Sequence, residues 1–351
     1  MATPYLRKTQ KEETSQLWET GPDHEILFRG QPAHFKGINW FSTDSCGAPN
    51  GLDRRSVDSI LDFLAYHRFN LIRLPITYEM MDNLNGYPNP SCLAADHGLS
   101  GITIGRVYEI ILEKARDKGI SVVVDLHTVR GQIHEYPWDT LKWEDIFAAW
   151  GKFIRAFQGF PNLLALDIAN EPHGSIGWDL WGGYTTAFIH NITMEYPAFQ
   201  GMFMVEGIQQ PTAAPWGGSF ETLPDDAIPI KERKRVIWSP HVYGVSVRGD
   251  MATYEGDQQF EAWFGNLLDR FPNPILIGET GGFMTDQDLA WHSRLKEYLI
   301  RKNIRNAAYW CLNPNSRDTS GLFMDEAWSQ VNWEKIKFME ELQPEPTKFV
   351  F

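Results

Sequence analysis

Residues 163–171 read LLALDIANE, a short apolar run that ends in an amide and a carboxylate side chain. Seven other short apolar runs occur along the chain. Several are continuous in Val, Ile and Leu, which is typical of parallel strands buried on both faces of a sheet. The other runs are HFKGINW (34–40), NLIRLP (70–75), SVVVDLH (121–127), MFMVEG (202–207), RVIWSPHVYG (235–244), PILIGE (274–279) and NAAYWC (306–311).

Stretches of helical pattern separate these runs, at 56–68, 102–118, 144–158, 179–195, 257–270 and 286–301. Ser56 is a suitable N-cap for the first stretch, and Gly119 is a suitable residue to end the second. The segment 208–235 is rich in Pro and Gly and shows no convincing helix. Alternating strands and helices predict a parallel sheet, and eight such units favour closure into a (β/α)8 TIM barrel. We expect one α/β barrel domain over residues 1–351, with its core at about 35–340.

The charge balance is acidic, because 45 Asp and Glu against 32 Lys and Arg give a formal net charge of −13. A field of this sign repels nucleic acids and anionic membranes and suits action on a neutral polymer. No apolar run approaches the roughly 18 residues of a membrane-spanning helix, so we expect no membrane partner. No GxGxxG or phosphate-binding loop follows the first run, which argues against a nucleotide-binding fold.

The first 16 residues are polar and do not form a signal peptide. We expect a secreted protein whose leader is absent from this sequence, and a cytoplasmic location stays open. The three cysteines form no metal-binding spacing. Cys311 ends an apolar run and is expected to be a buried thiol. Cys46 and Cys92 lie in loops rich in Gly, Pro and Asn, where a disulfide and two unpaired thiols are the alternatives.

Polar and aromatic side chains gather at or just past the carboxyl ends of the predicted strands. In a barrel these ends meet at one rim, where residues from different strands build the active site. We therefore expect the side chains to share one cleft. They contain no 2-His-1-carboxylate or other metal-binding pattern, so we expect no metal and no cofactor. The residues are Arg73, His127, Asn170, Glu171, His241, Tyr243, Glu279 and Trp310.

Two of these residues, Glu171 and Glu279, are carboxylates from different strands. Glycoside hydrolysis uses such a pair, one to protonate the leaving oxygen and one to attack the sugar or to activate water. A single glutamate at a strand end more often caps a helix or pairs with an arginine. Two glutamates together with the neighbouring polar side chains favour catalysis.

The motifs around both carboxylates resemble those of a known family. LALDIANEPHG (164–174) and LIGETGG (276–282) are similar to the acid/base and nucleophile strands of glycoside hydrolase family five. The resemblance implies a (β/α)8 barrel and a retaining glycosidase, with Glu171 as acid/base and Glu279 as nucleophile. It covers residues 35–333 and includes, in the family's order, Arg73, His127, His241, Tyr243 and Trp310.

Further segments resemble the endo-β-1,4-glucanase (cellulase) members of that family. The resemblance implies double-displacement hydrolysis of internal β-1,4-glucosidic bonds in cellulose or a related β-glucan, by a monomer that binds a polysaccharide or oligosaccharide. Mannan or mixed-linkage β-glucan is the alternative substrate, and a barrel that binds glycan without cutting it is the alternative class. TVRGQ (128–132) and Leu312 depart from the family pattern near the expected sugar subsites. The similar segments are KGINWF (36–41), VEGIQ (205–209), PWGGSF (215–220), SPHVYGVSV (239–247) and NPNSRDTSGLF (313–323).

The resemblance also implies roles for the neighbouring residues. Arg73 and Tyr243 would keep Glu279 ionised. Asn170 would bind the sugar 2-hydroxyl, a contact that strengthens in the transition state. Trp310 would stack on the sugar at the cleavage point.

His127 and His241 are expected to hold sugar hydroxyls or to orient the carboxyl groups. Asp44 is a candidate contact for a more distant sugar. The chain has 14 tryptophans, and several in or next to rim loops are candidates for stacking on sugars, with ordinary packing as the alternative. These candidates are Trp40, Trp178, Trp181 and Trp216.

Overall fold

The computed structural model describes residues 16–42, 46–130, 140–174, 176–209, 216–248 and 256–351. Within these residues, eight parallel strands form a barrel, and each of the eight apolar runs contributes one strand. The prediction of a (β/α)8 barrel is therefore confirmed. The strands are β4 (Lys36–Asn39), β5 (Leu71–Thr77), β6 (Ser121–Thr128), β7 (Leu163–Asp167), β8 (Met202–Val205), β9 (Val236–Trp238), β10 (Ile277–Thr280) and β11 (Ala307–Tyr309).

The strands pair in the order β10-β11-β4-β5-β6-β7-β8-β9. Neighbours in this order are consecutive in the chain, except β11 and β4, which are the last and the first strands of the barrel. Hydrogen bonds between the first and last strands of this order close the ring. Leu276 N–H donates to Trp238 O at 2.9 Å, and Gly278 N–H donates to Pro240 O at 3.1 Å. Because all eight strands are parallel, their carboxyl ends lie at one rim.

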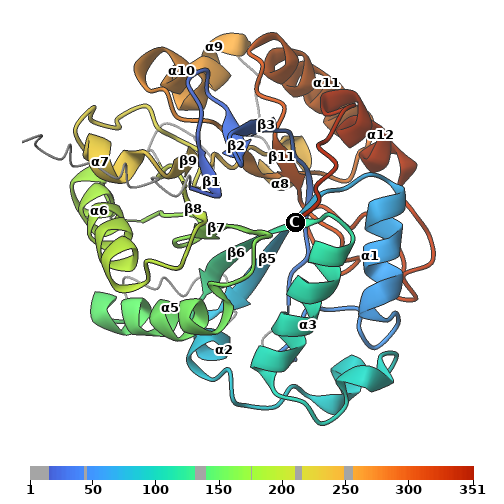
Figure 1. Ribbon diagram of the computed structural model, residues 1–351. Coiled ribbons are helices and arrows are strands. Elements are labelled where there is room, and N and C mark those ends of the chain that lie inside the picture. Colours follow the sequence, from blue (N-terminus) through green and yellow to red (C-terminus); the bar gives the residue numbers. More distant parts are fainter. Residues whose placement is uncertain (1–15, 43–45, 131–139, 175, 210–215, 249–255) are drawn as a thin grey trace, which may run out of the picture.

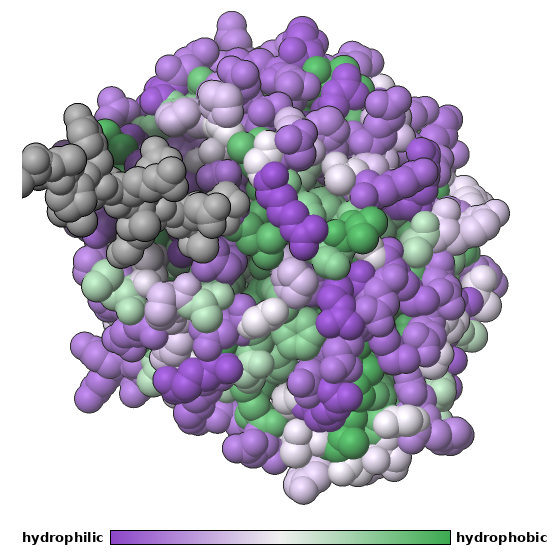
Figure 2. Space-filling model, viewed as in Figure 1, coloured by the Kyte–Doolittle hydropathy of each residue, from purple (hydrophilic) through white to green (hydrophobic). Residues whose placement is uncertain are grey.

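Helices surround the barrel (Figure 1), and the end of the molecule seen in the same view is mostly hydrophilic, with hydrophobic residues between (Figure 2). Pro90–Leu93 and His97–Leu99 form short 3-10 helices between α2 and α3. None of the described helices is long and apolar enough to span a membrane. The helices are α1 (Val57–Tyr66), α2 (Tyr78–Asp82), α3 (Ile104–Asp117), α5 (Trp143–Phe157), α6 (Trp178–Glu195), α7 (Ile230–Arg233), α8 (Val245–Arg248), α9 (Asp257–Phe260), α10 (Leu267–Arg270), α11 (Asp286–Arg301) and α12 (Trp333–Leu342).

The predicted caps are confirmed. The Ser56 side chain accepts a hydrogen bond from Ser59 N–H at 3.2 Å at the start of α1. Gly119 follows α3 with φ +70°, a left-handed conformation that glycine adopts without strain.

Two helix predictions need correction. The helix predicted at 257–270 is interrupted by a π-helical turn, Glu261–Gly265, between α9 and α10. The prediction of no helix in 208–235 is wrong for α7, four residues long. Its sequence, IKER, consists mostly of good helix formers, and Pro229 at the N-cap leads into it.

Three short antiparallel strands, which the sequence did not predict, cover the amino-terminal end of the barrel. Figure 1 looks down the barrel from this end, with the C-terminus near the centre. The Trp18 ring contacts Phe28 and Phe349, with ring centroids 4.6 and 5.6 Å apart. Strands of three residues are too short to show a hydrophobic period. They are β1 (Trp18–Thr20), β2 (Ile26–Phe28) and β3 (Gln31–Ala33).

Cys46 and Cys92 form a disulfide, with Cα atoms 5.7 Å apart, which settles the two alternatives that the sequence left. The bond joins the loop after β4 to the 3-10 helix Pro90–Leu93, which precedes α3. Cys311 is a buried thiol, as predicted, and burial raises its pKa to about 12.

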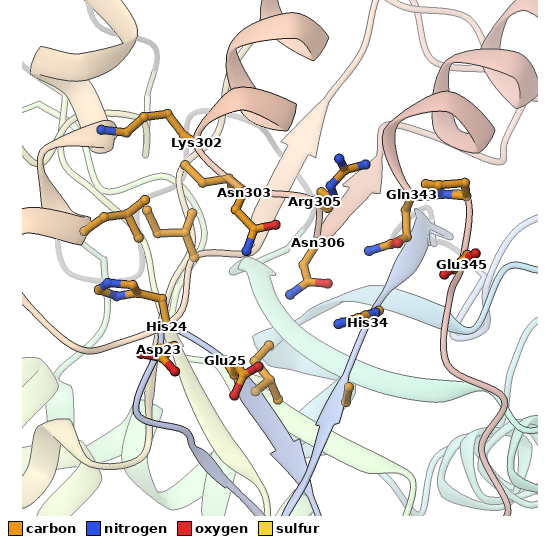
Figure 3. A pocket seen from close by; sticks show the side chains of 16 residues that line it. Asp23, His24, Glu25, His34, Lys302, Asn303, Arg305, Asn306, Gln343 and Glu345 are labelled. Atoms are coloured by element: carbon orange, nitrogen blue, oxygen red, sulfur yellow. The ribbon is translucent and has the colours of Figure 1, made fainter.

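A cavity of about 410 Å³ lies at the amino-terminal end of the barrel (Figure 3). Its wall includes His34, Ile275 and Asn306, which come just before β4, β10 and β11. Charged side chains of both signs line it, among them Asp23 and Lys302. This cavity is therefore at the end opposite to the rim where the polar residues gather.

Candidate active site

The strand ends bring the two predicted carboxylates and their neighbours together. Arg73 lies on β5 and Glu279 on β10, while Glu171 follows β7 by four residues. A parallel bridge pairs His241, which follows β9, with Glu279. One carboxyl oxygen of Glu171 and one of Glu279 lie within 4.8 Å of each other, with a ring nitrogen of His241 within the same distance of both.

Arg73 is fully buried among carboxyl groups. Its guanidinium donates to Glu279 Oε1 at 2.6 Å and to Asp167 Oδ2 at 2.9 Å. It donates to Glu206 Oε1 at 3.1 Å and lies 3.0 Å from Asp125 Oδ2. Burial opposes the positive charge, but these four carboxyl groups hold the pKa of Arg73 well above its ordinary value. Its cationic form is therefore fixed.

Both oxygens of Glu279 accept short hydrogen bonds. Besides Arg73 at Oε1, the Tyr243 hydroxyl donates to Oε2 at 2.5 Å. His241 Nδ1 lies 3.5 Å from the same oxygen. Burial disfavours the carboxylate, but His241, Arg73 and His127 outweigh it together with Tyr243, and the pKa of Glu279 falls below its ordinary value. This glutamate is the ionised member of the pair.

For Glu171, the influences that raise the pKa outweigh those that lower it. Burial raises its pKa, and the nearby charge of Glu279 raises it further, whereas the contact with His241 opposes the rise. His241 Nδ1 lies 3.0 Å from Glu171 Oε1, which leaves Oε2 as the oxygen that can carry a proton. The side chain of Glu171 is 19% exposed, so it reaches the surface of the site. Two neighbouring carboxyl groups with pKa values moved in opposite directions are the arrangement that an acid and base pair requires.

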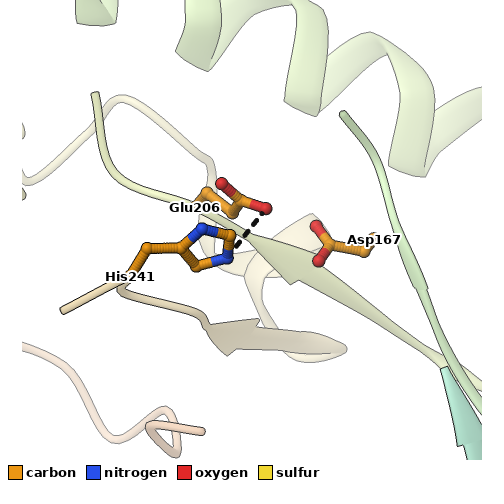
Figure 4. A group of neighbouring side chains, drawn as sticks. All are labelled: Asp167, Glu206 and His241. Atoms are coloured by element: carbon orange, nitrogen blue, oxygen red, sulfur yellow. Dashed lines mark ion pairs between the residues drawn. The ribbon is translucent and has the colours of Figure 1, made fainter. Parts of the chain in front are cut away.

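Three further carboxyl groups belong to this cluster, and sequence reasoning did not single them out. Asp125 lies 2.7 Å from His127 Nδ1, and Asp167 and Glu206 face His241 (Figure 4). All three carboxyl-bearing residues have 0% exposed surface. A visible signal existed, because each is an acidic residue inside or directly after an apolar run.

Trp310 directly follows β11 and is part of a row of parallel rings. Phe41 and His127 each lie 5.4 Å from it, with interplanar angles of 7° and 8°. All three rings are partly exposed. These partly exposed rings lie at the same rim as the two glutamates, where aromatic side chains suit contact with a sugar ring.

A family model described as Cellulase (glycosyl hydrolase family 5) matches residues 29–316, most of the chain. The chain belongs to glycosyl hydrolase family 5. Among curated proteins, it is 27% identical to an endoglucanase of Paenibacillus polymyxa over 86% of this chain and 81% of that protein. It is 26% identical to the major extracellular endoglucanase of Xanthomonas campestris pv. campestris over 89% of this chain and 68% of that protein.

Solved structures support the family 5 fold. An endocellulase of Pyrococcus horikoshii, solved with cellotetraose, superposes with a TM-score of 0.82 at 24% identity over 93% of this chain and 98% of that one. The catalytic domain of the Xanthomonas enzyme superposes with a TM-score of 0.81 at 23% identity over 93% of this chain and 100% of that one.

Three of the aromatic candidates are core residues of this family 5 barrel. Trp40 and Trp181 have no exposed surface, and Trp178 is 5% exposed. The indole N–H of Trp40 donates to Asn50 O, and that of Trp181 donates to Glu206 O. These three tryptophans therefore pack in the core, and the hypothesis that they stack on sugars is wrong.

Of the two remaining rim candidates, Trp216 is among the described residues and Asp44 is not. Trp216 is partly exposed and stacks on His173, with ring centroids 4.0 Å apart and an interplanar angle of 4°. His173 comes two residues after Glu171, so Trp216 stays a stacking candidate beside this glutamate.

Among the described residues, two sets of three side chains have the spacing of a metal site, which the sequence did not indicate: Asp167, Glu206 and His241, and Glu171, His241 and Glu279. In this family 5 chain, Arg73 occupies the cation position between the carboxyl groups. Burial opposes a charge on His241, but Glu206 and Glu279 hold its pKa well above its ordinary value. Both observations disfavour a metal ion, because a proton on His241 competes for the nitrogen lone pair and a second cation would face the charge of Arg73.

Proposed function

We propose that this chain is a retaining endo-β-1,4-glucanase in which Glu171 is the acid/base and Glu279 the nucleophile. The observation that carries the proposal is that one carboxyl oxygen of Glu171 and one of Glu279 lie within 4.8 Å of each other. Retaining glycosidases hold the two groups about 5–5.5 Å apart, whereas inverting enzymes need about 6.5–9.5 Å to admit a water. The opposite pKa shifts of the two groups support the same roles.

In the first step, a Glu279 oxygen attacks the anomeric carbon and the glycosidic C–O bond breaks. The proton of Glu171 passes to the leaving oxygen, which becomes the hydroxyl of the released chain. In the second step, Glu171 takes a proton from water, and the water oxygen displaces Glu279 from the anomeric carbon. Two inversions restore the original configuration.

The neighbouring side chains have matching roles in this proposal. Arg73 and Tyr243 stabilise the carboxylate of Glu279 before the attack. They stabilise it again when hydrolysis of the ester restores its negative charge. Arg73 donates to Asn170 Oδ1 at 2.9 Å, so the amide N–H2 of Asn170 points away from it and can meet the sugar 2-hydroxyl. Trp310 provides the face for the sugar at the cleavage point, and Phe41 stacks against Trp310.

The proposed substrate is a neutral β-1,4-glucan. Curated relatives that align over most of this chain are endoglucanases, and the formal net charge of −13 disfavours an anionic polymer. Viscosity and reducing sugar should be followed together on hydroxyethylcellulose, a soluble uncharged cellulose derivative, with mannan and mixed-linkage glucan as comparisons. Internal cleavage lowers viscosity long before much sugar is released. A viscosity that falls only in step with sugar release, or faster cleavage of mannan, would overturn the substrate assignment.

We also propose that the chain acts as a monomeric single catalytic domain in a secreted enzyme. The disulfide between Cys46 and Cys92 supports secretion, because such bonds persist in oxidising compartments. The name of the extracellular Xanthomonas relative supports it as well. Sedimentation of the protein, which should give a single species near 40.3 kDa, tests the monomer.

A further inference from the structure

Glu206 directly follows β8, and none of the roles above uses its side chain. It is fully buried beside the catalytic pair. Its Oε2 accepts a hydrogen bond from the backbone N–H of Glu171 at 2.6 Å, and its Oε1 accepts one from Arg73 at 3.1 Å. Trp181 Nε1 donates to the backbone oxygen of Glu206 at 3.0 Å and so helps to fix its position. A side chain from the next strand thus holds the main chain of the proposed acid/base.

The backbone of Glu171 needs such support. Its φ is +47°, in the left-handed region that side-chain-bearing residues rarely adopt. Such conformations persist where surrounding contacts fix them, and they concentrate at active sites. The bond from Glu171 N–H to Glu206 Oε2 is a contact of this kind.

The loop after β8 leaves room for this carboxylate. Gly217 has φ +66°, and a Cβ at this position would lie 2.4 Å from Glu206 Oε2 and 3.2 Å from Glu171 Cα. Only glycine therefore fits between the loop and the pair. This close approach is a second sign that the site is built around the Glu206 side chain.

The Glu206 carboxyl group also contacts His241, which in turn contacts the Glu171 side chain. His241 Nε2 lies 3.2 Å from Glu206 Oε1, an ion-pair contact whose angle is poorer than that of a hydrogen bond (Figure 4). Its Nδ1 faces Glu171 Oε1 at 3.0 Å. A carboxyl oxygen near each ring nitrogen favours an N–H on both.

We propose that Glu206 is a positioning residue of the catalytic centre: it holds the backbone of Glu171 directly and the Glu171 side chain through His241. Its effect is to keep the Nδ1–H group of His241 directed at Glu171 Oε1, as a hydrogen-bond donor. The proton that Glu171 transfers to the leaving group then stays on Oε2. This inference rests on the proposed role of Glu171 as acid/base.

The contact also sets the charge around both catalytic carboxyl groups. Burial raises the pKa of Glu206 well above its ordinary value, and His241 and Arg73 oppose this rise. Wherever Glu206 is ionised, its charge raises the pKa of His241. A neutral amide at position 206 removes this effect, so His241 loses its proton at lower pH. Glu279 and Glu171 then lose a neighbouring positive charge, and the pKa of each rises. The charged groups that face His241 are Glu171 and Asp167 from β7, Glu206 from β8 and Glu279 from β10, with Arg73 from β5 behind Glu206.

The test compares Glu206→Gln with the wild-type protein on two aryl β-cellobiosides, one with a poor and one with a good leaving group. We expect kcat on the poor leaving group to fall about 100-fold, because a small misplacement of the acid is costly there. The loss on the good leaving group should be much smaller. The optimum of kcat/KM should move to higher pH by about 1 unit.

A matched control separates positioning from folding. Asp288 is also a fully buried carboxylate that accepts backbone N–H bonds, from Ser246 and Met284, both at 3.1 Å. Asp288→Asn should lower the melting temperature without changing the pH optimum or the ratio of the two substrates. If Glu206→Gln does no more than this control, the positioning role is refuted.

A second variant applies if Glu206→Gln does not fold. Glu206→Asp keeps the charge near His241 but is too short to reach Glu171 N–H as well. It should keep the wild-type pH optimum and lose activity mainly on the poor leaving group, and wild-type behaviour on both substrates would overturn the inference. A wild-type protein that cleaves neither cellobioside would instead refute the proposed function.

Discussion

Removing the hydroxyl of Tyr243 should move the acidic limb of the pH–activity profile to higher pH. This hydroxyl donates to Glu279 Oε2 at 2.5 Å, and both residues are buried, so water cannot replace the bond fully. A hydrogen bond to a charged group contributes about 1.5–3 kcal/mol. One pKa unit corresponds to about 1.4 kcal/mol, so Tyr243→Phe should raise the pKa of Glu279 by about 1–2 units.

The sign follows from the role of Glu279. The nucleophile attacks only when ionised, so activity is lost as the pH falls through its pKa, which in the wild-type protein lies below the ordinary glutamate value. Raising that pKa removes activity at low pH. The basic limb, where Glu171 loses its proton above the ordinary glutamate value, should move much less.

The assay is kcat/KM for an aryl β-cellobioside across the pH range, with Tyr298→Phe as the control. The Tyr298 hydroxyl also donates to a carboxylate, Glu261 Oε2 at 2.6 Å, but Glu261 lies outside the site, in the π-helical turn after α9. The control should leave both limbs in place. An acidic limb that does not move in Tyr243→Phe, or that moves equally in the control, would refute the reasoning.

Other variants test the remaining roles. Glu279→Gln should abolish turnover and keep cello-oligosaccharide binding by calorimetry, whereas loss of both would indicate a structural role. Glu171→Gln should slow glycosides with poor leaving groups far more than activated aryl glycosides, and equal losses would contradict the acid/base role. Cys46→Ser, which frees Cys92, should lower the free energy of unfolding in urea by about 2–4 kcal/mol, and an unchanged midpoint would contradict this. Chelators should leave activity intact, and a loss that a divalent ion restores would show that the site needs a metal.

The barrel and the position of its site follow from the sequence for a simple reason. A parallel strand buried on both faces is apolar throughout, so a polar residue at its carboxyl end stands out. Arg73 and Glu279 are such residues, and both lie in the cluster as predicted.

What the sequence does not contain is the direction of each side chain next to a strand end. Trp40 and Phe41 are adjacent, and successive residues of extended chain point to opposite sides. Trp40 points into the core and Phe41 towards Trp310, the reverse of the expectation that Trp40 stacks on a sugar. Glu206 was missed for a related reason, since its importance depends on its contact with the left-handed backbone of Glu171.

The most direct test of the account is to trap the covalent intermediate. A 2-deoxy-2-fluoro-β-cellobioside with a good leaving group should form the glycosyl ester and hydrolyse it slowly, because fluorine destabilises both oxocarbenium-like transition states. Mass spectrometry of a protease digest should then find the added disaccharide on the peptide that contains Glu279. A label on another carboxyl group, such as Glu206, or no label from an enzyme that turns over the parent cellobioside, would contradict the central claim.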